Sequence, residues 1–371
     1  MAIQLDTSVE LHFEPKILGK DKDVRKARDN VSAIVLRGDH LWLGGDEGTS
    51  IDRMTRNALR RFDKHARFDL HGMLKLPAKP KEEIDIEGLD EDGGYLWLIG
   101  SHSAKRKKVE QEELQENTAA VNVERLGTVE VKGNRFTLAR VPLNGSAEPV
   151  ARHESLTAAR LEGDDTENVL TKALKTDPHF GRFVARLSSD GKDVEGIPSK
   201  DNGLDVEGLA VTGNRVFFGL RGPVLRGWAV IIELRVKAKS DDVLTLEPIG
   251  PAGGLYIKHF LKLDGLGVRE LVIHEKDLLV LAGPSMDLDG PVFIYRWRNA
   301  LEPNRDPLIF GDDLSPVVTV PFAKDKDHAE GLTVLTRAPL TVLVSYDSPG
   351  DDHLKTDDIA VVKADTFVVP A

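Results

Sequence analysis

Short apolar segments of this sequence carry acidic side chains at recurring places, which is unusual for strands that look buried. Four of these segments read "DIEGL", "DVEGL", "VREL" and "HAEGL". Residues two apart in a strand share a face, so Asp85 and Glu87 should point the same way while Ile86 points the other way. The residues predicted to share this face across the four copies, and to hold a metal, are Asp85, Glu87, Asp205, Glu207, Glu270, His328 and Glu330.

Such carboxylates need neutralisation if they converge. Two like charges about 6 Å apart repel by roughly 3 kcal/mol at an effective dielectric constant near 20. Four glutamates from four copies would repel by on the order of 10 kcal/mol, which rivals the stability of a typical domain. A divalent cation, nearby basic side chains, backbone N–H groups or partial protonation could each compensate. Carboxylate oxygens favour Ca²⁺ or Mg²⁺ over softer metals, so one of these ions is the predicted cofactor.

A structural role for the glutamates is an equal alternative. Each could accept hydrogen bonds from backbone N–H groups of the neighbouring repeat, because perturbed carboxylates occur in structural networks as well as in functional sites. The two roles could hold for different copies.

Polar residues also follow the second strand of each copy, on loops where binding residues are most often found. Arg221, between two glycines, is the candidate for gripping an anion or for pairing with a channel carboxylate. His102 is a candidate base or ligand, although a lone histidine in a polar loop is more often an ordinary hydrogen-bonding residue. The other residues at these tips include Asp46, Glu47, Ser101, Ser103, Ser285, Asp287, Tyr346, Asp347 and Ser348.

The acidic segments belong to a repeat. Each copy is a short strand, a turn and a second apolar strand, with a degenerate first copy at Asn30. Further strands follow in "RFTLARVPL", "WAVIIELRV", "PVFIYRWR" and "DIAVVKA", so one repeat is a four-stranded sheet. Sheets that repeat radially form a β-propeller, in which the first strand of each blade lines the central channel. The predicted fold is therefore all-β, a single propeller domain over residues 1–371.

The spacing of the copies leaves the number of blades open. Copies start near residues 30, 85, 205, 268 and 328, with one double-length gap. A weakly marked blade near residues 135–200 would give six blades, which is the preferred count, and an insertion there would give five. Five and seven blades are the alternatives. Residues 152–180 read as a helical insertion with Thr166 as a possible N-cap and Pro178 as its end. The segments "VELHF" and "TFVVP" could pair to close the ring.

Composition narrows the function further. A formal charge of −11 argues against a nucleic-acid or anionic-membrane partner, because such binders need a basic face. The absence of cysteine excludes disulfides, thiolate nucleophiles and cysteine-ligated zinc. The start of the sequence has no basic segment followed by an apolar one, so a cytoplasmic protein is the expectation. A small-molecule ligand or a protein partner is expected.

The motifs "GLDVEGLAV" (203–211) and "GLRGP" (219–223), together with "LWLIGSHSAKRK", resemble a bacterial family catalogued as domain of unknown function 3616. The resemblance covers about residues 25–350 and implies no activity. More distantly, the "EGL" segments are similar to those of phytase-like and lactonase-like propellers, and that similarity implies a metal held by acidic channel residues. Residues 152–180 lie outside it.

Two functions fit these observations. The first is a metal-dependent hydrolase of a small phosphate ester or lactone, with the acidic channel residues holding the cation, Arg221 holding an anionic group and His102 shuttling a proton. The second is a non-catalytic propeller that presents a ligand-binding or protein-binding surface, with structural channel glutamates.

Overall fold

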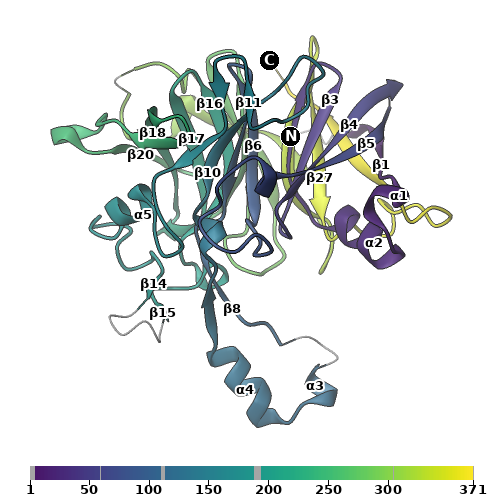
Figure 1. Ribbon diagram of the computed structural model, residues 1–371, viewed down its shortest axis with the longest axis horizontal. Coiled ribbons are helices and arrows are strands. Elements are labelled where there is room, and N and C mark those ends of the chain that lie inside the picture. The colour runs from purple at the N-terminus through teal and green to yellow at the C-terminus, as the bar shows by residue number, and fades with distance from the viewer. Residues whose placement is uncertain (1–4, 59, 110–112, 188–193, 304, 371) are drawn as a thin grey trace.

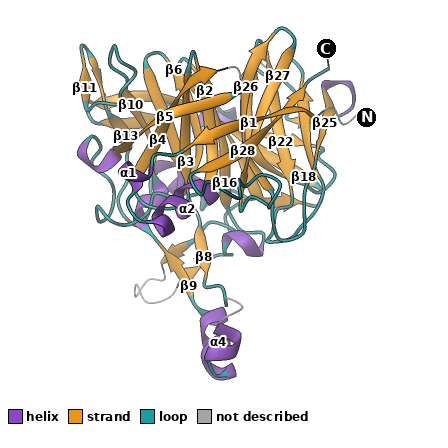
Figure 2. Cartoon of the chain, turned by 90° about the vertical axis from the view of Figure 1, so that its right-hand side faces the viewer, coloured by secondary structure: helices purple, strands orange, loops and turns teal. Residues whose placement is uncertain are grey.

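The computed structural model describes the chain except for residues 1–4, 59, 110–112, 188–193, 304 and 371, and strands make up most of its body (Figures 1 and 2). These strands form five four-stranded antiparallel sheets around a common axis, which is called the channel below. The inner strands are β2 (Val31–Arg37), β6 (Ile86–Asp92), β16 (Asp205–Thr212), β21 (Gly267–His274) and β26 (His328–Arg337). Each inner strand contacts the inner strands of the two neighbouring sheets, and β26 contacts β2, so the ring is closed. The fold is a β-propeller.

The remaining strands of each blade follow outward from the channel. The second strands are β3 (His40–Gly45), β7 (Tyr95–Gly100), β17 (Arg215–Leu225), β22 (Asp277–Gly283) and β27 (Leu340–Asp347). The third strands are β4 (Ser50–Ala58), β10 (Leu138–Pro142), β18 (Trp228–Ser240), β23 (Val292–Trp297) and β28 (Val361–Val368). The outer strands are β5 (Arg61–Asp69), β13 (Ala159–Leu161), β20 (Tyr256–Leu261), β25 (Leu314–Val320) and β1 (Leu5–His12). The four stretches predicted as further strands all contribute to third strands.

The preferred count of six blades is wrong for the described residues, and the alternative of five is correct. The described part of residues 135–200 forms no blade of its own, because β10 pairs with β7 and β13 pairs with β10 to complete the second blade. Within that described part, only two short hairpins, at residues 152–157 and 186–195, pair separately. The apolar packing gives the same count. Five buried clusters lie between adjacent sheets, one at each interface, and three of them contain a tryptophan, Trp42, Trp97 or Trp297. Each blade therefore buries side chains on both faces of its sheet, as packing between blades requires.

The ring closes through the two ends of the chain, as predicted from "VELHF" and "TFVVP". Strand β1 pairs antiparallel with β28, with Val9 opposite Ala364 and Leu11 opposite Val362. The last blade thus takes its outer strand from the N-terminal end and its other three strands from the C-terminal end. Separating the blades requires breaking this ladder, which makes it the closure of the propeller.

The helical insertion predicted for residues 152–180 is confined to α5 (Val169–Leu174). Asn168, not Thr166, is its N-cap, because the Asn168 side chain accepts from Thr171 N while Thr171 Oγ1 accepts from Asn168 N. The residues before it form a small hairpin, β11 (Arg152–His153) with β12 (Leu156–Thr157), and then β13. The apolar residues that predicted a helix, Val169, Leu170, Ala173 and Leu174, all lie in α5.

Several smaller elements decorate the blades. An arm follows β7 of the second blade and projects away from the body of the molecule (Figure 1). It consists of the paired strands β8 (Ala104–Arg106) and β9 (Val129–Val131) and the helices α3 (Glu113–Glu116) and α4 (Ala119–Gly127). The others are α1 (Pro15–Leu18), α2 (Asp21–Asp29), β14 (Arg186–Leu187), β15 (Val194–Glu195), β19 (Val243–Leu246), β24 (Leu308–Ile309) and the 3₁₀ turns 70–72, 133–136, 199–201, 251–253 and 311–313. No helix among the described residues is long and apolar enough to cross a membrane.

Candidate functional site

The channel mouth is built from equivalent positions of the five blades. Each inner strand has a register shift within one residue of the same point, so its backbone bulges there. The residues at that point, one from each blade, are Ser32, Glu87, Glu207, Arg269 and Glu330. An adjacent ring consists of the equivalent residues of the second strands, each directly after the residue that pairs with the one before the bulge: Asp46, Ser101, Arg221, Gly283 and Asp347. The bulges turn the first set of side chains toward the axis, where they meet the second.

In the fourth blade the position equivalent to the glutamates is occupied by Arg269, so the assignment of Glu270 to this ring is wrong by one residue. The Glu270 carboxylate instead accepts hydrogen bonds from Leu209 N at 3.0 Å and Leu271 N at 2.9 Å. Leu209 belongs to the neighbouring third blade, so Glu270 links two blades in the way that the structural alternative describes. Burial raises its pKa well above the usual range, although these two N–H groups oppose the shift. Glu270 is therefore not a candidate ligand for a cation in the channel.

Arg221 and Arg269 neutralise one half of the channel. Arg221 Nη1 lies 3.0 Å from Glu207 Oε1, and Arg269 Nε lies 3.1 Å from Glu207 Oε2. Arg269 also pairs with Glu330, and Arg221 Nη1 lies 3.9 Å from that carboxylate. Although burial opposes it, the two guanidinium groups hold the pKa of Glu207 below its usual value. Glu207 thus carries compensated charge, whereas burial raises the pKa of Glu330 to about 8 although Arg269 opposes the shift. Arg221 pairs with channel carboxylates, which is one of its two predicted roles.

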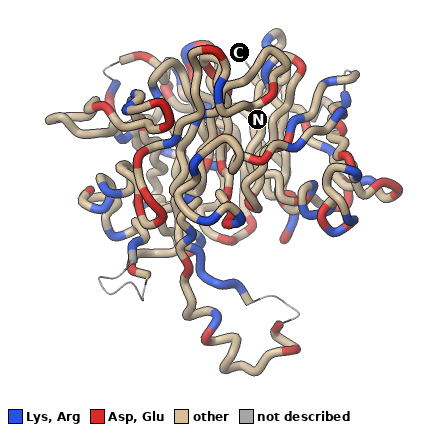
Figure 3. The backbone as a smooth tube through the Cα atoms, viewed as in Figure 1, with Lys and Arg blue, Asp and Glu red and all other residues tan. Residues whose placement is uncertain are grey.

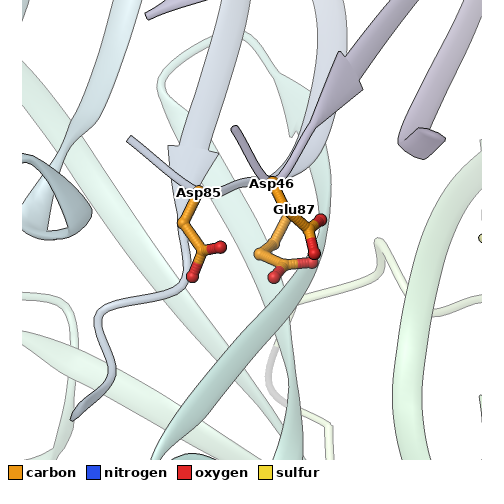
Figure 4. Close-up of side chains that lie close together, drawn as sticks. All are labelled: Asp46, Asp85 and Glu87. Carbon is orange, nitrogen blue, oxygen red and sulfur yellow. The ribbon is translucent and has the colours of Figure 1, made fainter. Parts of the chain in front are cut away.

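The other half of the channel holds a compact cluster of carboxylates. Asp46, Asp85 and Glu87 point into a common space (Figure 4), and one oxygen of each lies within 4.8 Å of the others. Asp85 precedes β6 in a left-handed conformation, with φ of 60°, so it does not share a strand face with Glu87 in the way that strand periodicity predicted. Ser32 Oγ donates to Asp46, and Arg135 Nε lies 3.3 Å from Asp85 Oδ2. These contacts orient two of the three carboxylates.

Glu87 is the uncompensated member of this cluster. The residue is 8% exposed, and no hydrogen bond or ion pair to its carboxylate is found within the described part of the chain. Burial and the neighbouring carboxylates, Asp46 first among them, raise its pKa well above the usual range. Burial, Asp85 and Asp347 likewise raise the pKa of Asp46 to about 7. Protons and cations would therefore compete for this cluster.

The three carboxylates fit a hard divalent cation. Calcium is coordinated by oxygen at 2.3–2.6 Å, so two ligands of one ion can lie at most about 5 Å apart. The separations in the cluster meet this limit. Waters or further oxygens would complete the coordination shell.

The remaining predicted ligands lie at the edge of this site. Asp205 has Lys200 Nζ at 3.8 Å, and burial raises its pKa to about 6 although Lys200 opposes the shift. His328 is about one-third exposed, with Nε2 3.6 Å from Asp289 and Nδ1 3.9 Å from Asp347. These two residues lie beside the carboxylate cluster and are not members of it.

The geometry does not support His102 as a proton shuttle. Its side chain is buried, its Nδ1 lies 2.7 Å from Gly100 O and its Nε2 lies 2.8 Å from Asn168 Nδ2. An N–H on Nδ1 donating to the carbonyl and a lone pair on Nε2 accepting from the amide satisfy both ring nitrogens. Burial lowers the pKa of His102 to about 4, so it is neutral at pH 7. Its role is to join the β7 loop to the N-cap of α5.

Sequence reasoning missed two residues of the site. Asp46 is among the predicted loop-tip residues and not among the predicted ligands, because the first copy has Ser32 where three of the other four copies carry a glutamate. The acidic residue of the fourth copy, Glu270, predicted the channel position one residue beyond Arg269. Aligning Val268 with Ile86, Val206 and Ala329, the apolar residues directly before the glutamates, would have found Arg269.

Comparison with solved structures finds distant similarity. A glutaminyl cyclase of Myxococcus xanthus is 8% identical, with 93% of each chain covered and a TM-score of 0.39. A PQQ-bound aldose sugar dehydrogenase of Streptomyces coelicolor is 10% identical, with 99% of this chain and 100% of that chain covered and a TM-score of 0.39. A periplasmic gluconolactonase of Pseudomonas aeruginosa is 12% identical, with 85% and 78% covered and a TM-score of 0.31. Likeness at this level carries no information about activity.

No curated protein matches the sequence. Residues 30–365 match a family described as "protein of unknown function (DUF3616)", which agrees with the resemblance carried by "GLDVEGLAV" and "GLRGP". Because the match spans nearly the whole chain, the protein belongs to the DUF3616 family.

Proposed function

We propose that this propeller is a divalent-cation-dependent hydrolase of a small phosphate ester or lactone, with Ca²⁺ or Mg²⁺ held by Asp46, Asp85 and Glu87. The observation that carries the proposal is Glu87, a buried carboxylate with no described partner beside two others. A bound cation would supply the missing charge, polarise the scissile bond and lower the pKa of a bound water. A structural carboxylate, by contrast, is paired or hydrogen-bonded, as Glu207 and Glu270 are.

Residues of the chain prepare the cluster for this role. Ser32 fixes Asp46 by donating a hydrogen bond, and Arg135 fixes Asp85 while it is itself held by Glu83. Glu87 projects from a bulge on a buried strand, so its backbone is rigid. The ligand oxygens are therefore pre-positioned, which lowers the ordering cost of binding a cation.

A non-catalytic binding propeller is the second candidate, and a specific observation favours it. Arg221 and His102, which were predicted to act on a substrate, are both buried and committed to protein partners. The described channel thus offers cation ligands without an obvious free acid–base pair. Catalysis would then depend on the cation and on groups nearer the surface, such as His328.

Calorimetric titration of EDTA-treated protein with Ca²⁺ and with Mg²⁺ tests the cation site. We expect one ion per chain for the wild type, and at least about tenfold weaker binding for Glu87→Gln, because one charged ligand is lost. The matched control is Asp351→Asn, which removes an exposed carboxylate in another loop and should bind like the wild type. The absence of a stoichiometric ion in the wild type would refute the hydrolase. Binding without turnover of phosphate esters or lactones would favour the binding module.

A further inference from the structure

The arm carries apolar side chains that no other described part of the chain covers. Ten large apolar residues are exposed in the described chain, and four of them lie on the two helices of the arm. They are Leu114 (57% exposed), Val121 (44%), Val123 (67%) and Leu126 (49%). Both views show the arm projecting away from the blades (Figures 1 and 2), so these side chains face solvent. Apolar surface that gathers in one place marks an interaction site.

Helix α4 turns a polar side toward the rest of the arm. Asn122 is its only buried residue, and the Asn122 side chain donates to the backbone of α3 at 3.1 Å. Arg125 is half-buried and pairs with a glutamate of α3 at 3.1 Å. Ala119, Val123 and Leu126, spaced four and three residues apart, share another face, and all three are exposed. This face, called the α4 stripe below, has the composition of a packed helix face but no partner among the described residues.

The arm is basic where it leaves the body and acidic at its far end (Figure 3). At its base, six basic side chains line a cleft together with Glu83 and Glu130. Five of the six have a carboxylate within 4.0 Å, and Lys105 has none among the described residues. On the helices, Glu116 and Glu124 are exposed and have no described basic partner. Unpaired charge of opposite sign therefore lies at the two ends of the arm.

An anionic membrane surface fits this arm poorly. Residues 104–131 contain five basic and six acidic residues, and two of the acidic ones lie outside the described residues. Glu116 and Glu124 lie on the same helices as the exposed apolar side chains, whereas a helix that enters an anionic lipid surface carries Lys and Arg there. The apolar residues therefore point to a protein partner, and the opposite charges at the two ends point to a second arm.

We propose that two copies of this chain pair through their arms, with the two α4 helices antiparallel. Val123 is the middle residue of α4, so a two-fold axis beside it places Val123 against the partner's Val123 and Ala119 against the partner's Leu126. Both α4 stripes are then covered. The same order brings the acidic far end of each arm beside the basic base of the other, so opposite charges meet twice. A parallel order would cover the stripes but bring like charges together.

This pairing goes beyond the proposed hydrolase and does not depend on it. Asp46, Asp85 and Glu87 lie on the body, so the arms should pair with or without a cation in the channel. Each propeller closes through its own β1–β28 ladder, so each copy folds without its partner.

Sedimentation velocity of the full chain over a series of concentrations tests the pairing. We expect the wild type to form dimers at tens of micromolar, and Val123→Glu to raise the dissociation constant at least about tenfold, because two carboxylates would be buried together at the axis. The matched control is Val121→Glu, which adds the same side chain to the same helix about 200° around its axis from Val123. Val121 is also exposed, so this variant should associate like the wild type.

Charge reversal tests the antiparallel order. Glu116→Lys should weaken association, because the new charge would lie beside the basic base of the partner's arm. Adding Lys105→Glu should restore part of the loss, because opposite charges would meet again. In a parallel order Glu116 would face the partner's Glu116, and the reversal would leave like charges together. An unchanged dissociation constant for Glu116→Lys would therefore contradict the antiparallel order.

Three results would overturn the pairing itself. The first is a wild type that stays monomeric at these concentrations. The second is a dimer that persists when Asn-Gly replaces residues 107–128, because its interface would then lie on the propeller. The third is equal weakening by Val121→Glu and Val123→Glu. A monomeric wild type that binds vesicles of phosphatidylcholine and phosphatidylserine would assign the apolar side chains to a membrane instead, and each of these results would leave the cation site to its own test.

Discussion

Arg269 of the fourth blade lies between Glu207 and Glu330, with its Nε 3.1 Å from Glu207 Oε2 and its Nη2 paired with Glu330. Three blades place a glutamate at the same bulge, and the arginine faces two of them. The ring of like charge that the repeat would otherwise create is thereby divided into a neutral half and a negative half. A cation is needed only in the second half, at Asp46, Asp85 and Glu87.

Replacing Arg269 should destabilise the propeller strongly. In Arg269→Gln, the buried carboxylates of Glu207 and Glu330 would have only Arg221 as a basic partner. Removing one partner of a buried ion pair costs about 3–5 kcal/mol. Urea unfolding at pH 7 should show this loss. Arg182→Gln is the control, because Arg182 is exposed and should change the free energy of unfolding by less than about 0.5 kcal/mol.

The same change offers an internal check. Adding Glu330→Gln to Arg269→Gln removes one of the stranded carboxylates, so the double variant should be more stable than the single one. A double variant that is less stable than Arg269→Gln would show that Arg269 acts through packing and not through charge.

Gly208 should be intolerant of even one methyl group. A Cβ at this position would lie 2.7 Å from the Glu270 Cα of the next blade, and its φ of 77° already disfavours other residues. Gly208→Ala should therefore lower the midpoint of thermal unfolding more than Gly213→Ala does, because the first variant adds a steric clash to the backbone strain. Gly213→Ala isolates the strain, because Gly213 has a similar φ of 62° with no atom near the added Cβ. Equal losses for the two variants would contradict a steric role at the blade interface.

The sequence predicted the architecture better than the site. The strand–turn–strand repeat and the complementary end segments were enough for a closed propeller, because strand periodicity and turn residues are local signals. The bulge is not local, since it appears only when β21 is paired with β22, and so Glu270 was mistaken for a channel residue. Asp46 joins its neighbours across the gap between the first and second blades, a contact that spacing along the chain cannot reveal.

The buried His102 should make the protein less stable as the pH falls below neutrality. Its pKa is lowered by burial to about 4, whereas an unfolded histidine titrates near 6.5. Between these values the unfolded state binds a proton that the folded state does not, so stability from this residue is present above pH 6.5 and is lost on acidification. Over that range the loss is at most about 3 kcal/mol.

Comparison with His102→Gln isolates this effect from other groups that titrate. Glutamine can keep a hydrogen bond in the loop but takes up no proton, so the stability advantage of the wild type should shrink between pH 6.5 and pH 4.5. Chemical unfolding of both proteins at several pH values measures the difference. A constant difference across this range would mean that His102 is not neutral and buried in the native state.

The arm should be dispensable for the stability of the propeller. The apolar residues Leu114, Val121, Val123 and Leu126 of its helices are exposed. A stretch of Lys and Arg residues lies where the arm leaves the body (Figure 3), on the two-stranded β8–β9 ladder. Near its base it contacts the body through the Arg106–Asp201 and Lys132–Glu83 ion pairs, and exposed pairs contribute only about 0–1 kcal/mol each. Arg106 and Val129 are paired at the end of the ribbon, so Asn-Gly in place of residues 107–128 would close it with a two-residue turn.

We expect this shortened protein to keep its free energy of unfolding within about 1 kcal/mol of the wild type, because almost no apolar surface of the arm is buried against the blades. Calorimetric Ca²⁺ titration should also be unchanged, since Asp46, Asp85 and Glu87 lie on the body. The matched control cuts into the body instead: Trp97→Ala removes a buried ring between the second and third blades and should cost about 3–5 kcal/mol. A comparable loss on shortening the arm would show that its helices are docked on the propeller in solution.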